Sequence, residues 1–185
     1  ATNSGLLLVP LMIGMLAASV VAGQIVTRTG RYRVLPIAGT AIAAVGLLLL
    51  STMDAATRRL ESGLYMTLLG IGLGLSMQVL VLATQNSVRV SDLGVATSSV
   101  NFFRSVGGSV GVALFGALFN SRLASGLAGG GAGVVDGTIT PQAIAALPAA
   151  QKAAFVDVFA GALTNVFLVA VPVMLVAFGL TWRLR

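Results

Sequence analysis

The 185-residue sequence contains no cysteine and no histidine. Without cysteine, disulfide bonds and thiol catalysis are excluded, and the two absences together remove the side chains of most metal sites. The lack of histidine also removes a common proton relay near neutral pH. We therefore predict no metal site and no cofactor.

Charged residues are also scarce, at 9% of the chain, whereas about 25% is typical of a soluble domain, whose surface must be wetted. Hydrophobic residues make up 57%, and a surface of this composition is favourable where lipid is the solvent. The formal net charge is +6, but the basic residues lie between apolar runs. This pattern favours orientation in a bilayer over nucleic-acid binding, so no nucleic-acid partner is expected.

Five apolar segments are long enough to cross a membrane, because about 20 helical residues span about 30 Å of hydrocarbon. Helices are expected rather than strands, since lipid offers no hydrogen-bond partner to an open backbone. The predicted fold is therefore an all-α, polytopic membrane helix bundle that forms one domain. Pro148 marks the expected start of a helix that leads into the last span. The predicted spans cover residues 5–26, 34–53, 62–85, 92–123 and 158–182, with a loop rich in Gly and Ala at 124–154.

The basic residues between the spans predict how the chain is oriented. Linker 27–33 carries three arginines, more than any other short linker. The positive-inside rule places this linker in the cytoplasm. We therefore expect a multi-pass protein of the plasma membrane, with loop 124–154 extracellular and the C-terminus cytoplasmic. Because the chain begins at Ala1 rather than Met, we interpret it as a fragment of a longer protein.

The first linker has the sequence GQIVTRTGRYR, residues 23–33. It resembles the cytoplasmic signature loop of the major facilitator superfamily, commonly written G-x-x-x-D-R-x-G-R-R/K. Thr27 stands where the family has an acid that helps to latch one conformation, so the resemblance implies the weaker second copy of the loop, between the eighth and ninth helices. A basic inner loop without a gating role is the alternative. The residues that carry the resemblance are Gly23, Arg28, Gly30, Arg31 and Arg33.

A second resemblance covers nearly the whole chain. Residues 78–86 (QVLVLATQN), 92–99 (DLGVATSS) and 101–111 (NFFRSVGGSVG) look like the C-terminal half of multidrug efflux permeases of the fourteen-helix drug:proton antiporter family. The resemblance implies that the five spans are the eighth to twelfth helices of the common core, and that the N-terminal half and the seventh helix are missing. It also implies that the first, third and fourth spans line a central cavity, whereas the second and fifth face lipid.

Arg104 is the only charged residue well inside a predicted span, about 18 Å along the helix from Asp92 at 1.5 Å per residue. A charge at such a depth costs at least about 2.5 kcal/mol on insertion scales, so it should face protein or water. One interpretation is a residue of the transport pathway or gate, paired with an acid in the missing half. The other is a side chain that reaches to inner-surface phosphates or to helix-end carbonyls.

Further residues are candidates for a cavity wall. Gln78 and Gln85 are seven residues apart and form a polar stripe that should turn inward from lipid. Their amides can contact a substrate or form hydrogen bonds between helices. Met and Phe suit a promiscuous apolar ligand, but they suit ordinary packing equally. The candidates for the substrate cavity are Met77, Gln78, Gln85, Asn101, Phe102 and Arg104.

Two pairs of glycines have the four-residue spacing of small-residue helix contacts, which let backbones approach closely. Helix packing and a conformational hinge are both open interpretations for them. The candidates are Gly70, Gly74, Gly107, Gly108 and Gly111.

No carboxylate lies deep inside a predicted span, since all five acidic residues are near span ends or in loops. Proton-coupled transport usually needs a titratable group within the membrane, so the coupling residue is expected in the missing half. No catalytic pair, P-loop or metal cluster is present either. The chain is therefore not expected to be an enzyme.

These observations predict part of a secondary active transporter, a proton-coupled exporter of small hydrophobic or cationic compounds that works by alternating access. Its expected partners are the lipid bilayer, the missing N-terminal half, the substrate and protons. The alternatives are a superfamily transporter of another substrate, such as a metabolite, and a structural membrane subunit without a transport cavity. A transporter should turn Gln78, Asn101 and Arg104 to one unfilled surface, whereas a structural subunit should bury them.

Overall fold

The computed structural model of the protein describes residues 8–30, 34–54, 57–129 and 149–183. Within these ranges all regular secondary structure is helical and no strand is formed, which confirms the predicted all-α fold. The elements are α2 (Val9–Thr29), α3 (Val34–Leu50), α4 (Arg59–Asn86), the short 3-10 helix η1 (Val90–Asp92), α5 (Leu93–Gly129) and α7 (Ala149–Trp182).

Among the described residues, four helices are long and apolar enough to cross a membrane, namely α2, α4, α5 and α7. The fifth helix, α3, has 17 residues, the lower limit of the roughly 17–25 that a spanning helix needs. It ends before the predicted limit at residue 53. The Ser51 hydroxyl donates to the Leu48 carbonyl oxygen at 2.7 Å, and the Thr52 hydroxyl donates to Leu49 at the same distance. Such local bonds compete with continuation of a helix.

The loop predicted at 124–154 is shorter than expected at both ends. α5 extends six residues beyond its predicted end, and α7 begins at Ala149, directly after Pro148, where a helix start was expected. Alanine has the highest helix propensity, and the extension is packed, because Gly126 of α5 lies against the side chain of Val158 of α7. The remaining residues of that loop lie outside the described ranges.

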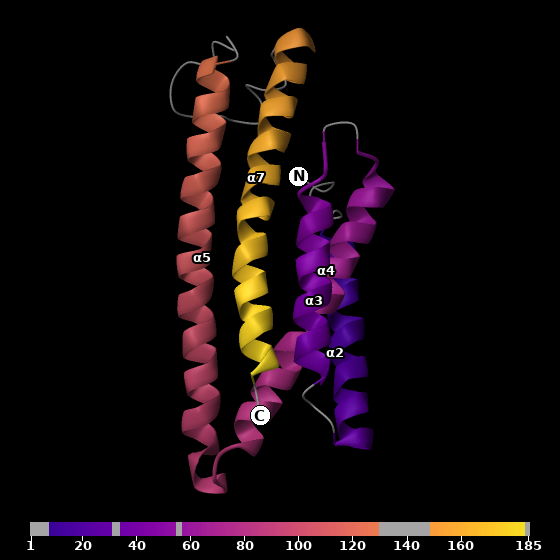
Figure 1. Cartoon of the computed structure of the whole chain (residues 1–185), viewed down its shortest axis with the longest axis vertical. Coiled ribbons are helices and arrows are strands. Elements are labelled where there is room, and N and C mark those ends of the chain that lie inside the picture. Colours follow the sequence, from indigo (N-terminus) through magenta and orange to yellow (C-terminus); the bar gives the residue numbers. More distant parts are fainter. Residues whose placement is uncertain (1–7, 31–33, 55–56, 130–148, 184–185) are drawn as a thin grey trace.

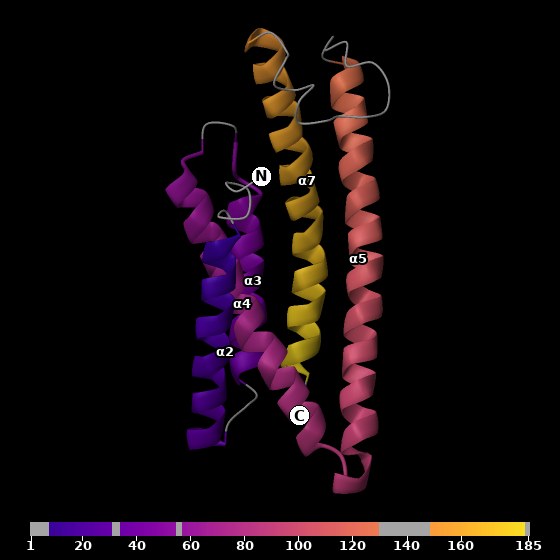
Figure 2. The same cartoon turned by 180° about the vertical axis from the view of Figure 1, so that it is seen from behind.

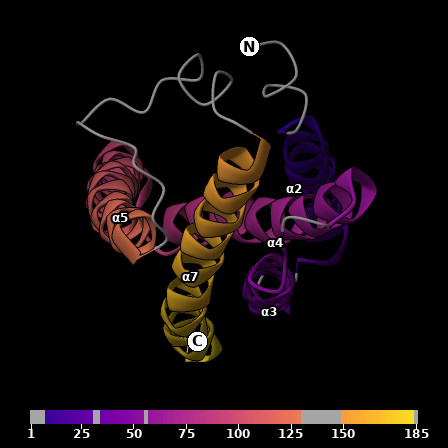
Figure 3. The ribbon, with the colours of Figure 1, turned by 90° about the horizontal axis from the view of Figure 1, so that it is seen from above.

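The helices form two groups that meet along α3 and α7. α4 passes between α2 and α3 and contacts both extensively (Figure 3). α7 lies between α3 and α5 in the side views and contacts both of them (Figures 1 and 2). α5 stands at the edge, where it contacts α7 and, near the link through η1, the end of α4 (Figure 1). No residue in the most apolar stretch of α5 is buried, so this helix has the least covered surface.

Small residues on α4 allow α2 to lie close to it. Gly70 and Gly74 face the backbone carbonyl oxygens of Leu11 and Met15 on α2, and a Cβ atom at either glycine would collide with them. The Ser19 hydroxyl of α2 donates to the Gly74 carbonyl oxygen at 3.3 Å. The contact between α2 and α4 is therefore a small-residue helix contact with one polar link.

Gly72, between these two glycines, faces α3 instead. A Cβ atom there would lie 2.6 Å from the Gly39 carbonyl oxygen and 2.8 Å from the Cα atom of Ala43. Gly46 of α3 faces α4 in turn, where a Cβ atom would lie 2.9 Å from the backbone nitrogen of Leu69. Residues two apart on a helix point about 200° away from each other. The Gly-x-Gly-x-Gly segment thus packs a helix on each side.

Hydroxyl groups join α7 to α3 and to the segment that follows α3. Thr40 Oγ1 and Thr181 Oγ1 are 3.3 Å apart, and Thr164 Oγ1 donates to the Met53 carbonyl oxygen at 3.0 Å. In the described part of the chain, every buried side-chain nitrogen or oxygen has a hydrogen-bond partner. Polar atoms that are covered by protein are thus satisfied, as folded proteins require.

Candidate functional site

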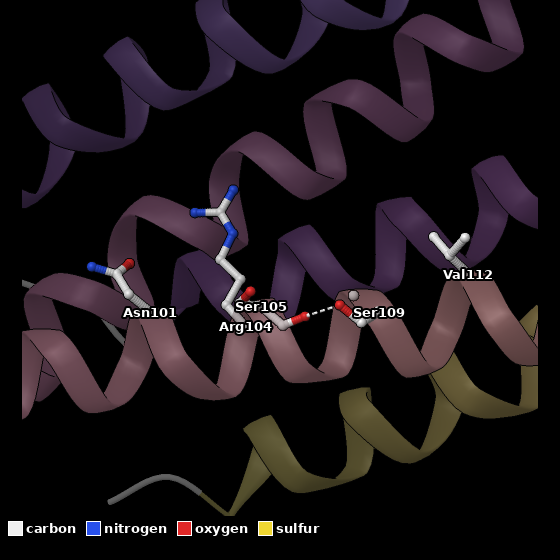
Figure 4. A pocket seen from close by; sticks show the side chains of 6 residues that line it. Asn101, Arg104, Ser105, Ser109 and Val112 are labelled. Atoms are coloured by element: carbon white, nitrogen blue, oxygen red, sulfur yellow. Dashed lines mark hydrogen bonds between the residues drawn. The ribbon is translucent and has the colours of Figure 1, made fainter.

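An open pocket of about 750 Å³ lies along α5 (Figure 4). This volume falls in the range of about 300–1,000 Å³ that is typical of small-molecule sites. Its lining residues recur at spacings of three and four, so they share one face of the helix. They are Asn101, Arg104, Ser105, Gly108, Ser109 and Val112.

Arg104 lies about 17 Å from the start of α5 at Leu93, at 1.5 Å per residue. Its side chain is exposed and extends from the edge of α5 that lies away from α7 (Figure 4). No hydrogen bond or ion pair joins Arg104 to another residue in the described part of the chain. The acid expected to pair with it is therefore not among these residues.

Asn101 precedes Arg104 by three residues, which places the two side chains about 60° apart around the helix. Asn101 is exposed, as are Ser105 and Ser109 farther along the same face. The Ser109 hydroxyl donates to the Ser105 carbonyl oxygen at 3.0 Å (Figure 4). The two serines were not predicted as site residues, although their four-residue spacing from Asn101 is the signal that identifies them.

Asp92 and Glu61 are far from this pocket. Asp92 precedes Arg104 by 12 positions, about 18 Å along the helix. Glu61 lies in the first turn of α4, at the opposite end of that helix from Gln85, which bonds to α5. No group of three acidic residues that could hold a metal ion occurs in the described ranges. Among the described residues, the pocket thus carries one uncompensated positive charge.

Phe102 does not share the pocket of Arg104. The two residues are two positions apart, which is about 200° around a helix. Phe102 instead lines a second hollow of about 560 Å³ toward the start of α5. Its ring meets that of Phe103 edge to face, with the ring centroids 5.7 Å apart. The predicted apolar wall and the charged residue therefore face different sides of α5.

The candidates on α4 do not line the α5 pocket either. Gln85 Nε2 donates to Thr97 Oγ1 of α5 at 3.2 Å, which agrees with the alternative of a hydrogen bond between helices. Gln78 is exposed and Met77 is half-buried on α4. Of the three polar residues predicted to share one unfilled surface, only the two on α5 do so.

The five glycines predicted for packing or hinge motion fall into two groups. Gly70 and Gly74 lie against α2, as described above. Gly107, Gly108 and Gly111 have no described atom within 4 Å of the place that a Cβ atom would take. Their surroundings are open because, among the described elements, α5 is mainly in contact with α7 and, near its own start, with α4 and η1. A packing or hinge role for these three stays a prediction.

The linker that follows α2 shows why one of its glycines is needed. Gly30 caps α2 with a φ of 66°, and its N–H donates to the Val26 carbonyl oxygen at 2.9 Å. This left-handed conformation strongly favours glycine. Thr27, in the position of the family's acid, donates its hydroxyl to Gln24 of the same helix at 3.0 Å. This hydrogen bond is local and does not reach a neighbouring helix.

The structure describes only two of the other four residues predicted for this linker. Gly23 is half-buried in α2, with open space where a Cβ atom would lie. Arg28 is exposed in the last turn of α2, where a cation complements the helix dipole. Arg31 and Arg33 lie outside the described residues.

Comparison with known proteins decides the family, although no family model matches the chain. The chain is 50% identical to an uncharacterized MFS-type transporter of Mycobacterium tuberculosis, over 100% of its own length and 27% of that relative. The chain belongs to the MFS-type transporters. It is also 41% identical to the multidrug transporter protein MdtP of Bacillus subtilis, over 62% of the chain and 21% of that relative. It is 36% identical to a tetracycline resistance determinant of Streptomyces rimosus, over 62% of the chain and 33% of that relative.

The relatives confirm the major facilitator superfamily that the signature-like loop and the residues of the last spans predicted. The MFS chain is thus a multi-pass membrane segment, as its four long apolar helices also indicate. It spans only 27% of the length of the first relative. The activity, substrates and partners of the whole transporter are therefore matters for proposal.

Proposed function

We propose that this chain forms one wall of the substrate pathway in an MFS exporter of small, largely apolar compounds, driven by exchange with protons. The α5 pocket carries the proposal. Asn101 and Arg104 stand exposed there on a long, mostly apolar helix, without a partner in the described chain. Ionisable residues within membrane helices almost always face the interior of a bundle or a water-filled cavity rather than lipid. A cavity shared with the rest of the transporter satisfies that requirement.

The direction of transport rests on the relatives. Two of them are named for multidrug transport and for tetracycline resistance, and export accounts for both names. We propose that the chain is the C-terminal part of a fourteen-helix drug:proton antiporter, and that it rocks against the other part to give alternating access. The tight glycine contacts of α4 with α2 and α3 support movement of these three helices as a unit.

Proton coupling in this proposal depends on residues outside the described chain. Among the described helices, α2, α3 and α5 carry no carboxylate, α4 has Glu61 in its first turn, and α7 has Asp157 in its first third, away from its middle. A titratable group within the membrane is the usual site of coupling, so the rest of the transporter must supply it. A cationic substrate would likewise need carboxylates from there.

The proposed orientation follows the arginines of linker 27–33, which place that linker and the C-terminus in the cytoplasm of a plasma-membrane protein. Exposure of Asn101 and Arg104 supports a transporter over a structural subunit, which would bury them. Within the described chain, no partner accounts for the presence of these two polar side chains on the helix. With the rest of the transporter they become part of a cavity wall.

The proposal is tested with the full-length transporter in inverted membrane vesicles that carry an imposed proton gradient. The vesicles should accumulate Nile red, a neutral apolar dye, and a protonophore should abolish the accumulation. Asn101→Leu should lower the accumulation several-fold, because it fills the pocket and removes an amide. Asn120→Leu is the matched control, since Asn120 is an exposed asparagine on the same helix outside the pocket.

Equal accumulation by the Asn101 and Asn120 variants would remove the α5 pocket from the pathway. Accumulation that is indifferent to the protonophore would exclude proton exchange. Each result contradicts a separate part of the proposal, so the pathway and the driving force are tested independently.

A further inference from the structure

We propose that the α5 pocket binds an anionic group of the transported compound, with the Arg104 guanidinium as its counter-ion. This inference rests on the proposed function, because it names the substrate class of the same site. It also reverses the sign of the charge expected on the substrate. The ligand chemistry is a small organic acid with a carboxylate or sulfonate group.

The first support is the distribution of charge around Arg104. Asp92 is about 18 Å away along α5, and α5 itself contains no acidic residue. Asp157 of α7 lies two residues before Phe159, whose ring contacts that of Phe119 at a centroid distance of 5.3 Å. Phe119 is 15 residues beyond Arg104, about 22 Å along the helix. Asp157 is therefore far from the pocket as well.

Glu61 is equally remote. Gln85, which bonds to the start of α5, is 24 residues beyond Glu61 on α4, or about 36 Å along that helix. The guanidinium thus forms no ion pair with a carboxylate of the described chain. Near a protein surface two unit charges attract about four times more strongly than in bulk water. An anion is stabilised at Arg104, and a cation is repelled.

The second support is the set of donors beside the guanidinium. Arginine presents a planar fork of N–H groups that matches the two oxygens of a carboxylate. Asn101 adds amide N–H groups, and Ser105 adds a hydroxyl whose hydrogen is not used within the described chain. Ser109 contributes no donor, because its hydroxyl bonds to the Ser105 carbonyl oxygen. The free donors of the pocket therefore lie beside the charge.

The third support is the open space beside Gly108, one turn beyond Arg104. Gly108 lies four residues beyond Arg104 and lines the same pocket, with no described atom near the place of a Cβ. A group bound by the guanidinium therefore meets no side chain at Gly108. Val112 ends the pocket with an apolar surface. A ligand whose charged group contacts Arg104 and whose short apolar part reaches Val112 fits this order of residues.

The experiment compares two dyes that share a xanthene core and differ in charge. Carboxyfluorescein is the anion, and tetramethylrhodamine ethyl ester is the cation. Their binding to the purified full-length transporter in detergent is measured by fluorescence anisotropy. The wild type should bind the anion more tightly. Arg104→Gln should weaken anion binding at least tenfold and leave cation binding unchanged or stronger, whereas Arg104→Lys, which keeps the charge but loses the planar fork, should weaken anion binding less than Arg104→Gln does.

Arg122→Gln is the matched control. Arg122 is an exposed arginine on the same helix, 18 residues or five turns beyond Arg104, and it does not line the pocket. Its loss should change neither affinity. If Arg104→Gln does not fold, competition on the wild type decides: benzenesulfonate should displace carboxyfluorescein, and phenyltrimethylammonium should not.

Equal loss of both dyes in Arg104→Gln would overturn the inference and assign Arg104 to helix packing or to an acid elsewhere in the transporter. Equal affinity of the wild type for both dyes would also overturn it. The proposed function fails by a different result, namely charge-selective binding without proton-driven accumulation in vesicles. Proton-driven transport that depends on Asn101 but shows no preference for anions would uphold the function and reject the inference.

Discussion

Replacement of Gly72 by alanine is the sharpest test of how α4 is held between its neighbours. The added Cβ atom would lie 2.6 Å from the Gly39 carbonyl oxygen and 2.8 Å from the Cα atom of Ala43, whereas ordinary contacts are 3.4–4 Å. Both contacted atoms belong to the backbone of α3, so no side chain can turn away. The helices must separate by several tenths of an ångström and lose dispersion contacts along their interface.

The expected magnitude follows from overpacking of a close contact, which typically destabilises by about 1–3 kcal/mol. The gain in helix propensity on replacing glycine with alanine, about 0.5–1 kcal/mol, offsets part of this. We therefore expect a net loss of roughly 0.5–2 kcal/mol in the free energy of unfolding for Gly72→Ala. The measurement is unfolding of the full-length protein in mixed micelles as the proportion of denaturing detergent rises.

Gly161→Ala on α7 is the control, because Gly161 is exposed and has no described atom within 4 Å of the place of a Cβ. It should be neutral or slightly stabilising, since only helix propensity changes. If Gly72→Ala is as stable as this control, then α3 and α4 do not approach as closely as the structure shows. The packing account of the Gly-x-Gly-x-Gly segment would then be wrong.

Two further pairs of substitutions test local features of the structure. Gly30→Ala should lower the free energy of unfolding by about 1–2 kcal/mol because of its left-handed conformation, and Gly30→Asn should recover part of the loss; equal stability of the two variants would contradict the cap. Gln85→Leu and Thr97→Val should each be mildly destabilising, with a coupling energy of about 0.6 kcal/mol in a double-mutant cycle. A coupling energy of zero would contradict the hydrogen bond between Gln85 and Thr97, and the Gln85 amide would again be a candidate for the cavity wall.

Helix boundaries show how far local sequence rules reach. The start of α7 after Pro148 followed from the ring of proline, which suits a helix start. The early end of α3 did not follow from hydropathy, because Ser51 and Thr52 carry hydroxyls that bond to the preceding turn. Hydropathy counts such residues as part of an apolar run, whereas the backbone responds to their hydrogen bonds.

The candidate site stays a prediction, but the structure shows how its residues are placed. Asn101 and Arg104 were identified because polar groups are costly in lipid wherever they occur, and they do share a pocket. Phe102, which was predicted together with them, lines a different hollow, because residues two apart on a helix lie on nearly opposite sides. Gln85 could be assigned only by the position of its partner Thr97, which is on another helix.

The sequence by itself determined that the protein is embedded in lipid, that it is helical, and that polar residues on its fourth span need protein or water around them. These conclusions depend on composition, on segment length and on the solvation of single groups, all of which are local properties. Only the tertiary structure decided which glycines meet a neighbouring helix and which stand open. Gly70, Gly74 and Gly107 are equally small in the sequence, but the first two lie against α2 and the third has no described neighbour. The difference arises because close packing depends on where a second helix lies, and that position is set by contacts between distant parts of the chain.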